Sequence, residues 1–263
     1  MPEFSLLSLN TFGIPFFLSL GRIKRLASEL NRVTPTVVCL QEIQQNVYVP
    51  LLKKYLTKYS HLSSFPNRFA PMGGLFTASI PIGSSIFHPF PNRGRPLSIG
   101  FADWALYKGV LMTSLEIYGR QVTVMNTHLQ ANYLGNWDSS NRQTQIELDQ
   151  VKFLADLART QPDDAWVFIC GDFNFPRETP PYDLMMAESG LTDALADDPR
   201  PTYRPFPLVS AKWQMSLDYF FYRRPAGIDT PVTADIIPIE NSTAGWYFQR
   251  FLTDHHALVL NIG

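Results

Sequence analysis

The chain has few cysteines, little net charge and no long apolar runs. Each of these absences excludes some classes of protein. Its two cysteines, Cys39 and Cys170, both lie in apolar stretches, so buried thiols are expected rather than a disulfide. A formal net charge of −1 over 263 residues gives no overall attraction to nucleic acid, although a local basic face is compatible with it.

Two further absences concern membranes and export. No apolar stretch reaches the roughly 18 residues that a membrane-spanning helix needs, and the first five residues lack the basic and apolar regions of a signal peptide. We therefore expect a soluble, cytoplasmic protein, with a secreted form left open if a leader was removed. Hydrophobic residues at 45% and aromatic residues at 13% are typical of a globular chain. Without a visible linker or repeat, a single domain over residues 1–263 is expected.

Hydrophobic periodicity predicts a mixture of helices and strands. Apolar residues at positions 23, 26, 27 and 30 have the spacing of a helix with one buried face. A second helix, capped by Ser139 or Ser140, is expected to run to about Arg159. Strands are predicted at 4–9, 36–40, 73–80, 165–170, 217–222 and 256–262, a β-hairpin at 110–117 and 121–126, and proline-rich loops at 87–96 and 199–207.

Two polar segments next to predicted strands carry the clearest chemistry. Asp172 ends an apolar strand and is followed two residues later by Asn174, and Asp254 stands beside His255 just before the last strand. Carboxylate and amide oxygens are the ligands of hard divalent cations, and an imidazole can activate water. The combination predicts metal-assisted hydrolysis of a phosphoric ester.

Other polar residues also fall at the ends of predicted strands, which in a layered α/β fold meet at one rim. Each residue alone has an ordinary explanation. The sequence at 171–174 is a common turn, a lone histidine can be a satisfied core residue, and a carboxylate after a strand can be solvated. The coincidence across the whole set favours a functional site. Its members are Asn10, Glu42, His128, Asp172, Asn174, Asp218, Asp254 and His255.

In this order the set resembles the endonuclease/exonuclease/phosphatase superfamily, whose fold is that of pancreatic deoxyribonuclease. The resemblance implies an α/β (α+β) fold, a four-layered sandwich of two packed β-sheets flanked by helices, with the site at the sheet edges. It spans nearly the whole chain, through Leu9-Asn10, Gln41-Glu42, Asn126-Thr127-His128, Gly171-Asp172-Phe173-Asn174, Leu217-Asp218-Tyr219 and Asp254-His255.

Within that superfamily, five shorter segments are similar to neutral sphingomyelinases. Together they favour a phospholipid-type phosphodiesterase over a nuclease. Related membrane-active sphingomyelinases can carry a hydrophobic hairpin or a C-terminal membrane span, and neither stands out in this sequence. The similar segments are Asn10-Thr11-Phe12-Gly13-Ile14-Pro15, Asp103-Trp104 with Lys108-Gly109-Val110, Thr127-His128-Leu129-Gln130-Ala131, Asn141-Arg142-Gln143-Thr144-Gln145 and Gly190-Leu191-Thr192-Asp193-Ala194.

The residue types suggest a division of roles around a magnesium ion, with manganese as an alternative. Glu42, with Asn10 nearby, would hold the cation against a phosphoryl oxygen. Asp172 would bind the metal or position the leaving group, and Asp254 would be a further metal ligand.

Proton transfer falls to the histidines and their partners. His255 would be the general base, since an unperturbed imidazole titrates near ~6.5, and Asp218 would orient it. His128 and Asn174 would donate hydrogen bonds to phosphoryl oxygens.

Several residues keep two interpretations. Lys108 either contacts phosphate or sits in the turn before a strand. Arg142 is a weaker substrate candidate that more simply anchors its helix beside the site. His256 should face away from His255, because side chains alternate along a strand. The aromatic run at 245–248 either meets an acyl chain or a membrane interface, or fills the edge of the core.

Three functions follow, in this order. The first is a magnesium-dependent phosphodiesterase that releases a phospholipid head group or cleaves a smaller ester, with peripheral membrane contact as an option. The second is a metal-dependent endo/exonuclease or small-molecule phosphoesterase of the same superfamily. The −1 charge and the lack of a basic stripe argue against nucleic acid. The third, a non-catalytic binding module, is disfavoured because every residue of the set is present.

Overall fold

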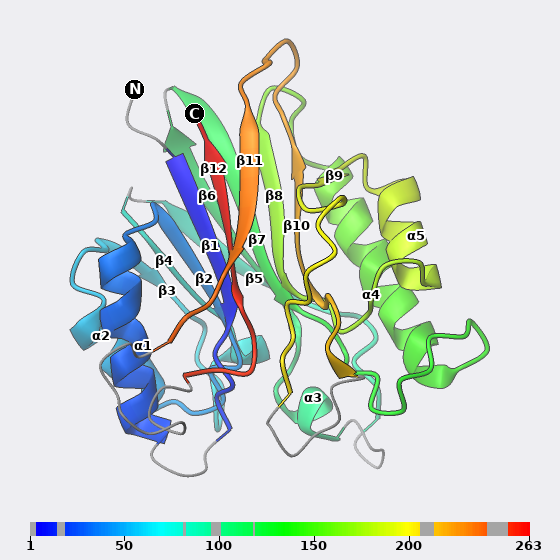
Figure 1. Ribbon diagram of the computed structural model, residues 1–263, viewed down its shortest axis with the longest axis horizontal. Helices are drawn as coiled ribbons and strands as arrows, with labels where there is room; N and C mark the ends of the chain where they lie inside the picture. Colours follow the sequence, from blue (N-terminus) through cyan, green and yellow to red (C-terminus); the bar gives the residue numbers. More distant parts are fainter. Residues whose placement is uncertain are drawn as a thin grey trace.

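The computed structural model describes residues 4–14, 19–80, 83–95, 101–117, 119–205, 213–240 and 252–263. In this part of the chain, two six-stranded β-sheets lie face to face with helices on their outer sides (Figure 1). The four-layered sandwich predicted from the sequence is therefore confirmed. No helix in these ranges is both long and apolar enough to cross a membrane.

The first sheet mixes parallel and antiparallel neighbours. β1 runs parallel to β2 and antiparallel to β12, so that it occupies the middle of the sheet. In spatial order, the strands are β11 (Val232–Ile237), β12 (Ala257–Ile262), β1 (Phe4–Asn10), β2 (Val37–Gln41), β4 (Phe76–Ser79) and β3 (His61–Ser63).

The second sheet is built around the predicted hairpin. β6 and β7 pair antiparallel, β7 runs parallel to β8, and β10 lies antiparallel to β8. In spatial order, the strands are β5 (Ser84–Pro89), β6 (Gly109–Ile117), β7 (Arg120–His128), β8 (Trp166–Asp172), β10 (Asp218–Arg223) and β9 (Thr192–Asp193).

The helices form the two outer layers. α1 and α2 pack on the first sheet, and α4 and α5 pack on the second (Figure 1). The cap of α4 is Asn141, whose side chain accepts a hydrogen bond from the backbone N–H of Gln143, rather than the predicted Ser139 or Ser140. The helices are α1 (Ser19–Val33), α2 (Tyr48–Tyr55), the short 3-10 turn η1 (Met72–Gly74), α3 (Phe101–Ala105), α4 (Arg142–Arg159) and α5 (Pro180–Glu188).

Burial on both faces explains why the central strands read as unbroken apolar runs. In β8, Phe168 and Cys170 enter the core between the sheets, whereas Val167 and Ile169 pack under α4 and α5. Side chains alternate along a strand, so a sheet covered on both faces needs apolar residues at every position. Both cysteines are buried free thiols, as predicted.

Two predicted elements differ in their bounds. The strand expected at 73–80 begins only at Phe76, because Gly73 and Gly74 have positive φ values of 67° and 64° and belong to η1. The loop expected at 87–96 begins with the last residues of β5. Pro89 is tolerated there because β5 is an edge strand, where a missing N–H costs little. The remainders of both proline-rich stretches lie partly outside the described residues.

The topology brings the polar strand ends to one rim. β1 and β2 run parallel, as do β7 and β8, and each parallel pair ends at this rim. β10 and β12 run antiparallel to their neighbours, so they begin there. Side chains at strand ends far apart in the sequence therefore meet in space.

Gly171, next to the end of β8, tests how tightly this rim is packed. A Cβ at this position, with φ at +145°, would lie 1.9 Å from the carbonyl oxygen of Thr127 on β7. We expect Gly171→Ala to lower the free energy of unfolding by about 2–4 kcal/mol, measured by urea denaturation. Gly190→Ala is the matched control: it also has a positive φ but open space around it, and should cost only about 1 kcal/mol. Equal losses in the two variants would contradict the close packing of β7 and β8.

Candidate active site

The rim of the two sheets gathers all eight residues of the polar set. Each of them contacts at least one other member, either through a hydrogen bond or through a histidine nitrogen within 3.9 Å of a carboxylate oxygen, so they form one connected group. The group consists of Asn10, Glu42, His128, Asp172, Asn174, Asp218, Asp254 and His255.

Asn10 connects the carboxylates of the two sheets. Its Nδ2 donates to Glu42 Oε1 at 3.1 Å and to Asp172 Oδ2 at 2.8 Å. Its Oδ1 accepts from the backbone N–H of Phe12 at 3.0 Å. The amide nitrogen, and not the oxygen, therefore faces the carboxylates in this structure. Asn10 orders two acidic side chains that come from different sheets.

The backbone around Glu42 is held in a sparsely populated conformation. Phe12, Glu42 and Asn174 have φ values of 50°, 58° and 58°, and all three line the same cavity. Left-handed non-glycine residues of this kind are uncommon and cluster at functional sites. Gly13 lets the two segments approach, because a Cβ there would fall 1.5 Å from the Glu42 carbonyl oxygen.

His255 is oriented by Asp218 and, behind it, by Thr202. His255 Nδ1 lies 2.8 Å from Asp218 Oδ2, which also accepts from Thr202 Oγ1 at 2.6 Å. The Thr202 hydroxyl oxygen in turn accepts hydrogen bonds from the backbone N–H groups of Leu217 and Asp218, each at 3.0 Å. Thr202 was not predicted from the sequence, because a threonine in a proline-rich loop carries no motif that marks it.

The other ring nitrogen of His255 faces the carboxylates. Nε2 lies 3.8 Å from Asp172 Oδ2 and 3.9 Å from Asp254 Oδ1. Burial lowers the pKa of His255, but the charge and hydrogen bond of Asp218, with Asp172 and Asp254, raise it well above its ordinary value. The pKa of His255 is therefore higher than the ordinary value of ~6.5 on which the sequence-based expectation rested.

The buried carboxylates hold their protons more strongly than free ones. Burial, with the charge of Asp218, raises the pKa of Asp172 to about 6. Burial, with the charge of Glu42, raises the pKa of Asp254 to about 7. The pKa of Glu42 is raised by burial as well. Crowded carboxylates of this kind are stabilised in their charged form by a cation.

The donor set fits a divalent cation with hard oxygen ligands. Glu42, His128 and Asp172 each offer one ligand atom, and these atoms lie within 4.8 Å of one another. Asp254 Oδ1 is buried and has no hydrogen-bond partner among the described residues. Carboxylate oxygens are the ligands that Mg²⁺ and Mn²⁺ prefer, so Glu42 and Asp172 can hold either ion.

His128 and Asn174 complete the polar floor. His128 Nε2 lies 3.7 Å from Asp172 Oδ2, and burial, with the charges of Lys108 and His255, lowers the pKa of His128 well below its ordinary value. The ring is therefore neutral at physiological pH. The Asn174 backbone N–H donates to Asp172 Oδ1 at 2.9 Å, while its side-chain Nδ2 donates to the Leu129 carbonyl at 3.1 Å.

The two weaker substrate candidates lie away from the cavity. Lys108 is buried, and its Nζ lies 2.5 Å from Asp103 Oδ1 and donates to the Leu129 carbonyl at 2.5 Å, so it supports the loop from behind. Arg142 is exposed and lines a separate pocket of 220 Å³ together with Arg95. The aromatic run at 245–248 lies outside the described residues.

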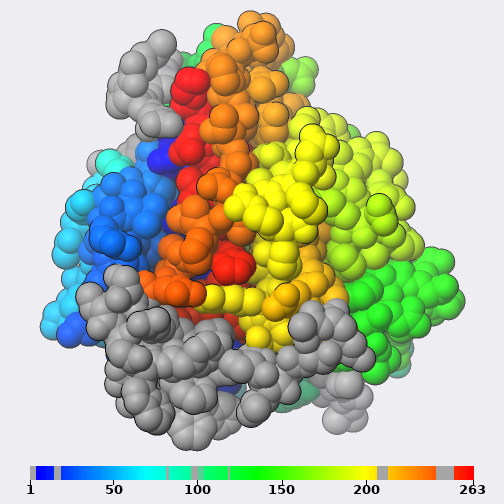
Figure 2. Space-filling model, in the orientation of Figure 1, coloured from blue at the N-terminus to red at the C-terminus, as the bar shows by residue number. Residues whose placement is uncertain are grey.

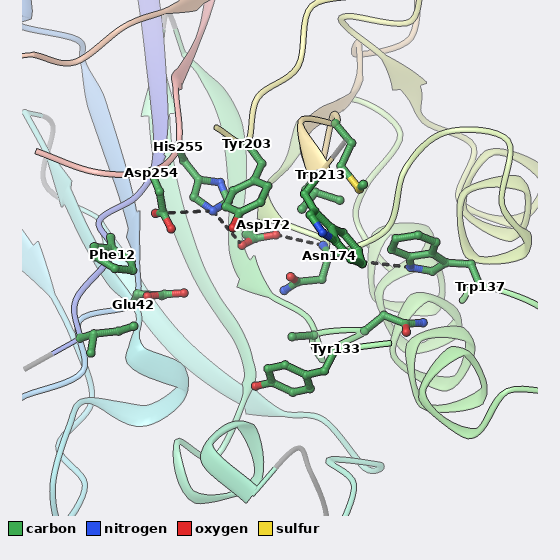
Figure 3. A pocket seen from close by; sticks show the side chains of 15 residues that line it. Phe12, Glu42, Tyr133, Trp137, Asp172, Asn174, Tyr203, Trp213, Asp254 and His255 are labelled. Carbon is green, nitrogen blue, oxygen red and sulfur yellow. Dashed lines mark hydrogen bonds and ion pairs between the residues drawn. The ribbon is translucent and has the colours of Figure 1, made fainter. Parts of the chain in front are cut away.

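A cavity of about 410 Å³ lies next to the acidic group, and five aromatic side chains are among the residues that line it (Figure 3). No lysine or arginine is among the described residues that line it. Sequence reasoning missed this wall, because its residues come from separate loops without a shared spacing. Its aromatic members are Phe12, Tyr133, Trp137, Tyr203 and Trp213.

One part of the wall pairs directly with the segment that carries His255. Tyr203 forms an isolated β-bridge with His255, and their rings lie 5.1 Å apart. Figure 2 shows the segment near residue 200, in yellow, against the C-terminal segment in red. The loop that carries Thr202 and Tyr203 thus both orients the imidazole and walls the cavity.

Comparison with known proteins identifies the family and the relatives of this chain. Residues 7–255 match the profile of the Endonuclease/Exonuclease/phosphatase family. The chain is 24% identical over 274 residues to a Drosophila melanogaster protein provisionally named a neutral sphingomyelinase, covering 99% of this chain and 60% of that protein. It is 28% identical over 198 residues to an inositol phosphosphingolipids phospholipase C of Schizosaccharomyces pombe, covering 73% and 46%. The chain therefore spans about half the length of these relatives.

Solved structures share the fold at lower identity. A beta toxin mutant from Staphylococcus aureus with bound magnesium ions superposes with a TM-score of 0.77 at 20% identity, covering 98% of this chain and 99% of that one. TDP2 of D. rerio, complexed with a single-strand DNA product, gives a TM-score of 0.75 at 21% identity and full coverage of both chains. Both likenesses support the two-sheet architecture.

Cation binding at the acidic group should depend on pH. Below the pKa values of about 7 for Asp254 and about 6 for Asp172, protons compete with the cation. We expect Mg²⁺ or Mn²⁺ affinity, measured by calorimetry, to fall at least tenfold from pH 8 to pH 5.

Asp254→Asn should weaken binding at pH 8 and flatten the pH dependence. Asp235→Asn, which changes an exposed carboxylate on β11, should leave both unchanged. An affinity that is constant between pH 5 and pH 8 would contradict binding at these carboxylates.

Proposed function

Because this chain belongs to the Endonuclease/Exonuclease/phosphatase family, we propose that it is a magnesium-dependent phosphodiesterase that cleaves a phospholipid head-group ester of the sphingomyelinase type. The observation that carries the proposal is the His255–Asp218 pair, whose free ring nitrogen faces Asp172 and Asp254. A histidine base beside hard cation ligands is the equipment that hydrolysis of a phosphoric ester requires.

Glu42, Asp172 and Asp254 would hold the cation, and Asn10 would keep the first two in place through its amide hydrogens. When bound, magnesium supplies positive charge that stabilises the negative charge growing on the phosphoryl group. The raised pKa of Asp254 and the orphaned Oδ1 of the same residue support a cation at this position. Manganese fits the same ligands.

His255 would take the proton of the attacking water at Nε2. Its Nδ1 is committed to Asp218 at 2.8 Å, which fixes the tautomer and stabilises the imidazolium that forms. The ring must be neutral before it can accept a proton, so activity should rise with pH through the raised pKa of His255.

Two further residues would contact the phosphoryl group. His128 is neutral and carries one ring N–H that can donate to an oxygen. Asn174 lines the cavity next to Asp172 and has a second amide hydrogen beyond the one given to Leu129. Both side chains would stabilise negative charge without competing for the attacking water.

The cavity walls favour a lipid head group over a nucleic acid. A polynucleotide needs cationic side chains for its successive phosphates, and the described lining has none. Aromatic walls instead suit a substrate with an apolar part. The alternative is a metal-dependent endo/exonuclease or a small-molecule phosphoesterase, and the likeness to TDP2 bound to DNA is the observation that favours it.

Parallel assays of sphingomyelin and supercoiled plasmid test the substrate. We expect magnesium-dependent release of the phosphorylated head group, abolished by EDTA, with His255→Ala lowering kcat by about 10²- to 10⁴-fold. His88→Gln, on the edge strand β5, is the control histidine and should retain activity. Plasmid nicking without head-group release would instead establish the nuclease.

Asp218→Asn should move the acid limb of the kcat–pH profile. The Asp218 carboxylate raises the pKa of His255, so its removal lowers that pKa, and the neutral base persists to lower pH. We expect the limb to shift downwards by about one pH unit or more, while the maximal kcat falls at least 100-fold because the imidazolium loses its partner. A limb that stays in place, or moves upwards, would show that another group controls it.

A further inference from the structure

A buried carboxyl group lies behind the cavity wall, outside the acidic group of the site. Glu147 is on the inner face of α4 with 0% exposure, and neither of its carboxyl oxygens has a hydrogen-bond partner among the described residues. An isolated carboxylate is strongly disfavoured in such surroundings, so the group takes a proton instead. Burial raises the pKa of Glu147 to about 9, which leaves it neutral at physiological pH.

The two polar side chains that interact with the Glu147 carboxyl belong to the wall of the cavity. The Asn132 amide and the Trp137 indole N–H are the groups that favour its charged form, although neither is in full hydrogen-bonding geometry with it. Both residues line the cavity. The Asn132 amide is already bonded to the carbonyl of Asn136 at 2.9 Å.

Trp137 connects Glu147 to Asn174, which belongs to the polar floor of the site. Its Nε1 donates to the Asn174 carbonyl at 3.2 Å (Figure 3), and the Asn174 N–H is bonded to Asp172 Oδ1 at 2.9 Å. An indole has a single N–H. The Asn174 carbonyl and the Glu147 carboxyl therefore compete for one hydrogen.

We propose that Glu147 is a positioning residue. Its neutral carboxyl leaves the Trp137 N–H bonded to the Asn174 carbonyl, and this hydrogen bond fixes the wall of the cavity against the polar floor. A neutral carboxyl is a weak acceptor, and a carboxylate is a strong one. Ionisation of Glu147 would draw the indole away from Asn174. Because the Asn174 N–H is bonded to Asp172, the position of Asp172 would be disturbed as well.

The charges around Glu147 are few. Among the described residues, the charged side chain that acts on it is Lys108, on the loop before β6, which lowers its pKa. Lys108 is itself bound to Asp103 of α3 at 2.5 Å. Asn132 and Trp137, on the loop after β7, contribute no charge. The titration of Glu147 is thus separate from that of the acidic group in the cavity.

Tryptophan fluorescence tests the proposal without any substrate. Between pH 7 and pH 11, the wild-type chain should show a transition near pH 9 that Glu147→Gln lacks, since glutamine keeps an acceptor but cannot ionise. Trp137→Phe should also lack it. Glu188→Gln, at an exposed glutamate on α5, should retain it. A transition near pH 9 with the same midpoint and amplitude in Glu147→Gln would overturn the proposal, because the tyrosines and the other tryptophans, which are the same in both chains, would then account for it.

Kinetics, which rest on the proposed function, distinguish positioning from a purely structural role. Glu147→Ala should lower kcat/KM about tenfold, while its Mg²⁺ affinity stays within twofold of the wild-type value. At pH 8, Glu147→Gln should retain most of the wild-type kcat/KM. The alkaline fall in wild-type activity should disappear in Glu147→Gln. Equal impairment of both variants would overturn positioning. If no phosphodiester is cleaved by the wild type, the proposed function fails, and the fluorescence comparison still decides the role of Glu147.

Discussion

The hydrogen bonds from the Asn10 side chain to Glu42 and Asp172 are the contacts on which the geometry of the site depends. Asn10 ends β1 in the first sheet, whereas Asp172 ends β8 in the second. The amide therefore joins the two layers at the rim where their polar strand ends meet. Behind it, Gln41 and Asn126 bond across the same two sheets at 2.8 Å. A fixed spacing of the sheets sets the spacing of the polar groups at the rim.

The electrostatics of the site follow from this forced proximity. Carboxylates from both sheets are buried together, and this burial raises the pKa of Asp172 and of Asp254. The negative charge of the carboxylates raises the pKa of His255 against the opposing effect of burial. Such an arrangement favours whatever positive charge is present, either an imidazolium or a metal ion. On the proposed function, the crowding that is unfavourable for the bare chain would be the source of an affinity for a divalent cation.

The sequence was sufficient to predict the sandwich and the polar rim, because both rest on local patterns. Apolar runs that end in residues such as Glu42 or Asp172 mark strand ends, and strand ends meet at one rim in a layered fold. Thr202, Trp137 and Glu147 could not be found in this way. Their roles depend on loop conformation and on burial behind a wall, and neither leaves a periodic signal in the sequence.

The most direct test of the account is the position of the cation. Crystals of the chain grown with Mn²⁺, examined by anomalous diffraction, should show one main peak about 2.1 Å from a carboxylate oxygen of Glu42, in reach of Asp172. His255 Nε2 should stay free of the metal and face the cavity. A peak on Nε2 itself, or a well-ordered rim without any peak at saturating Mn²⁺, would contradict the claim that these carboxylates form a cation site served by a histidine base.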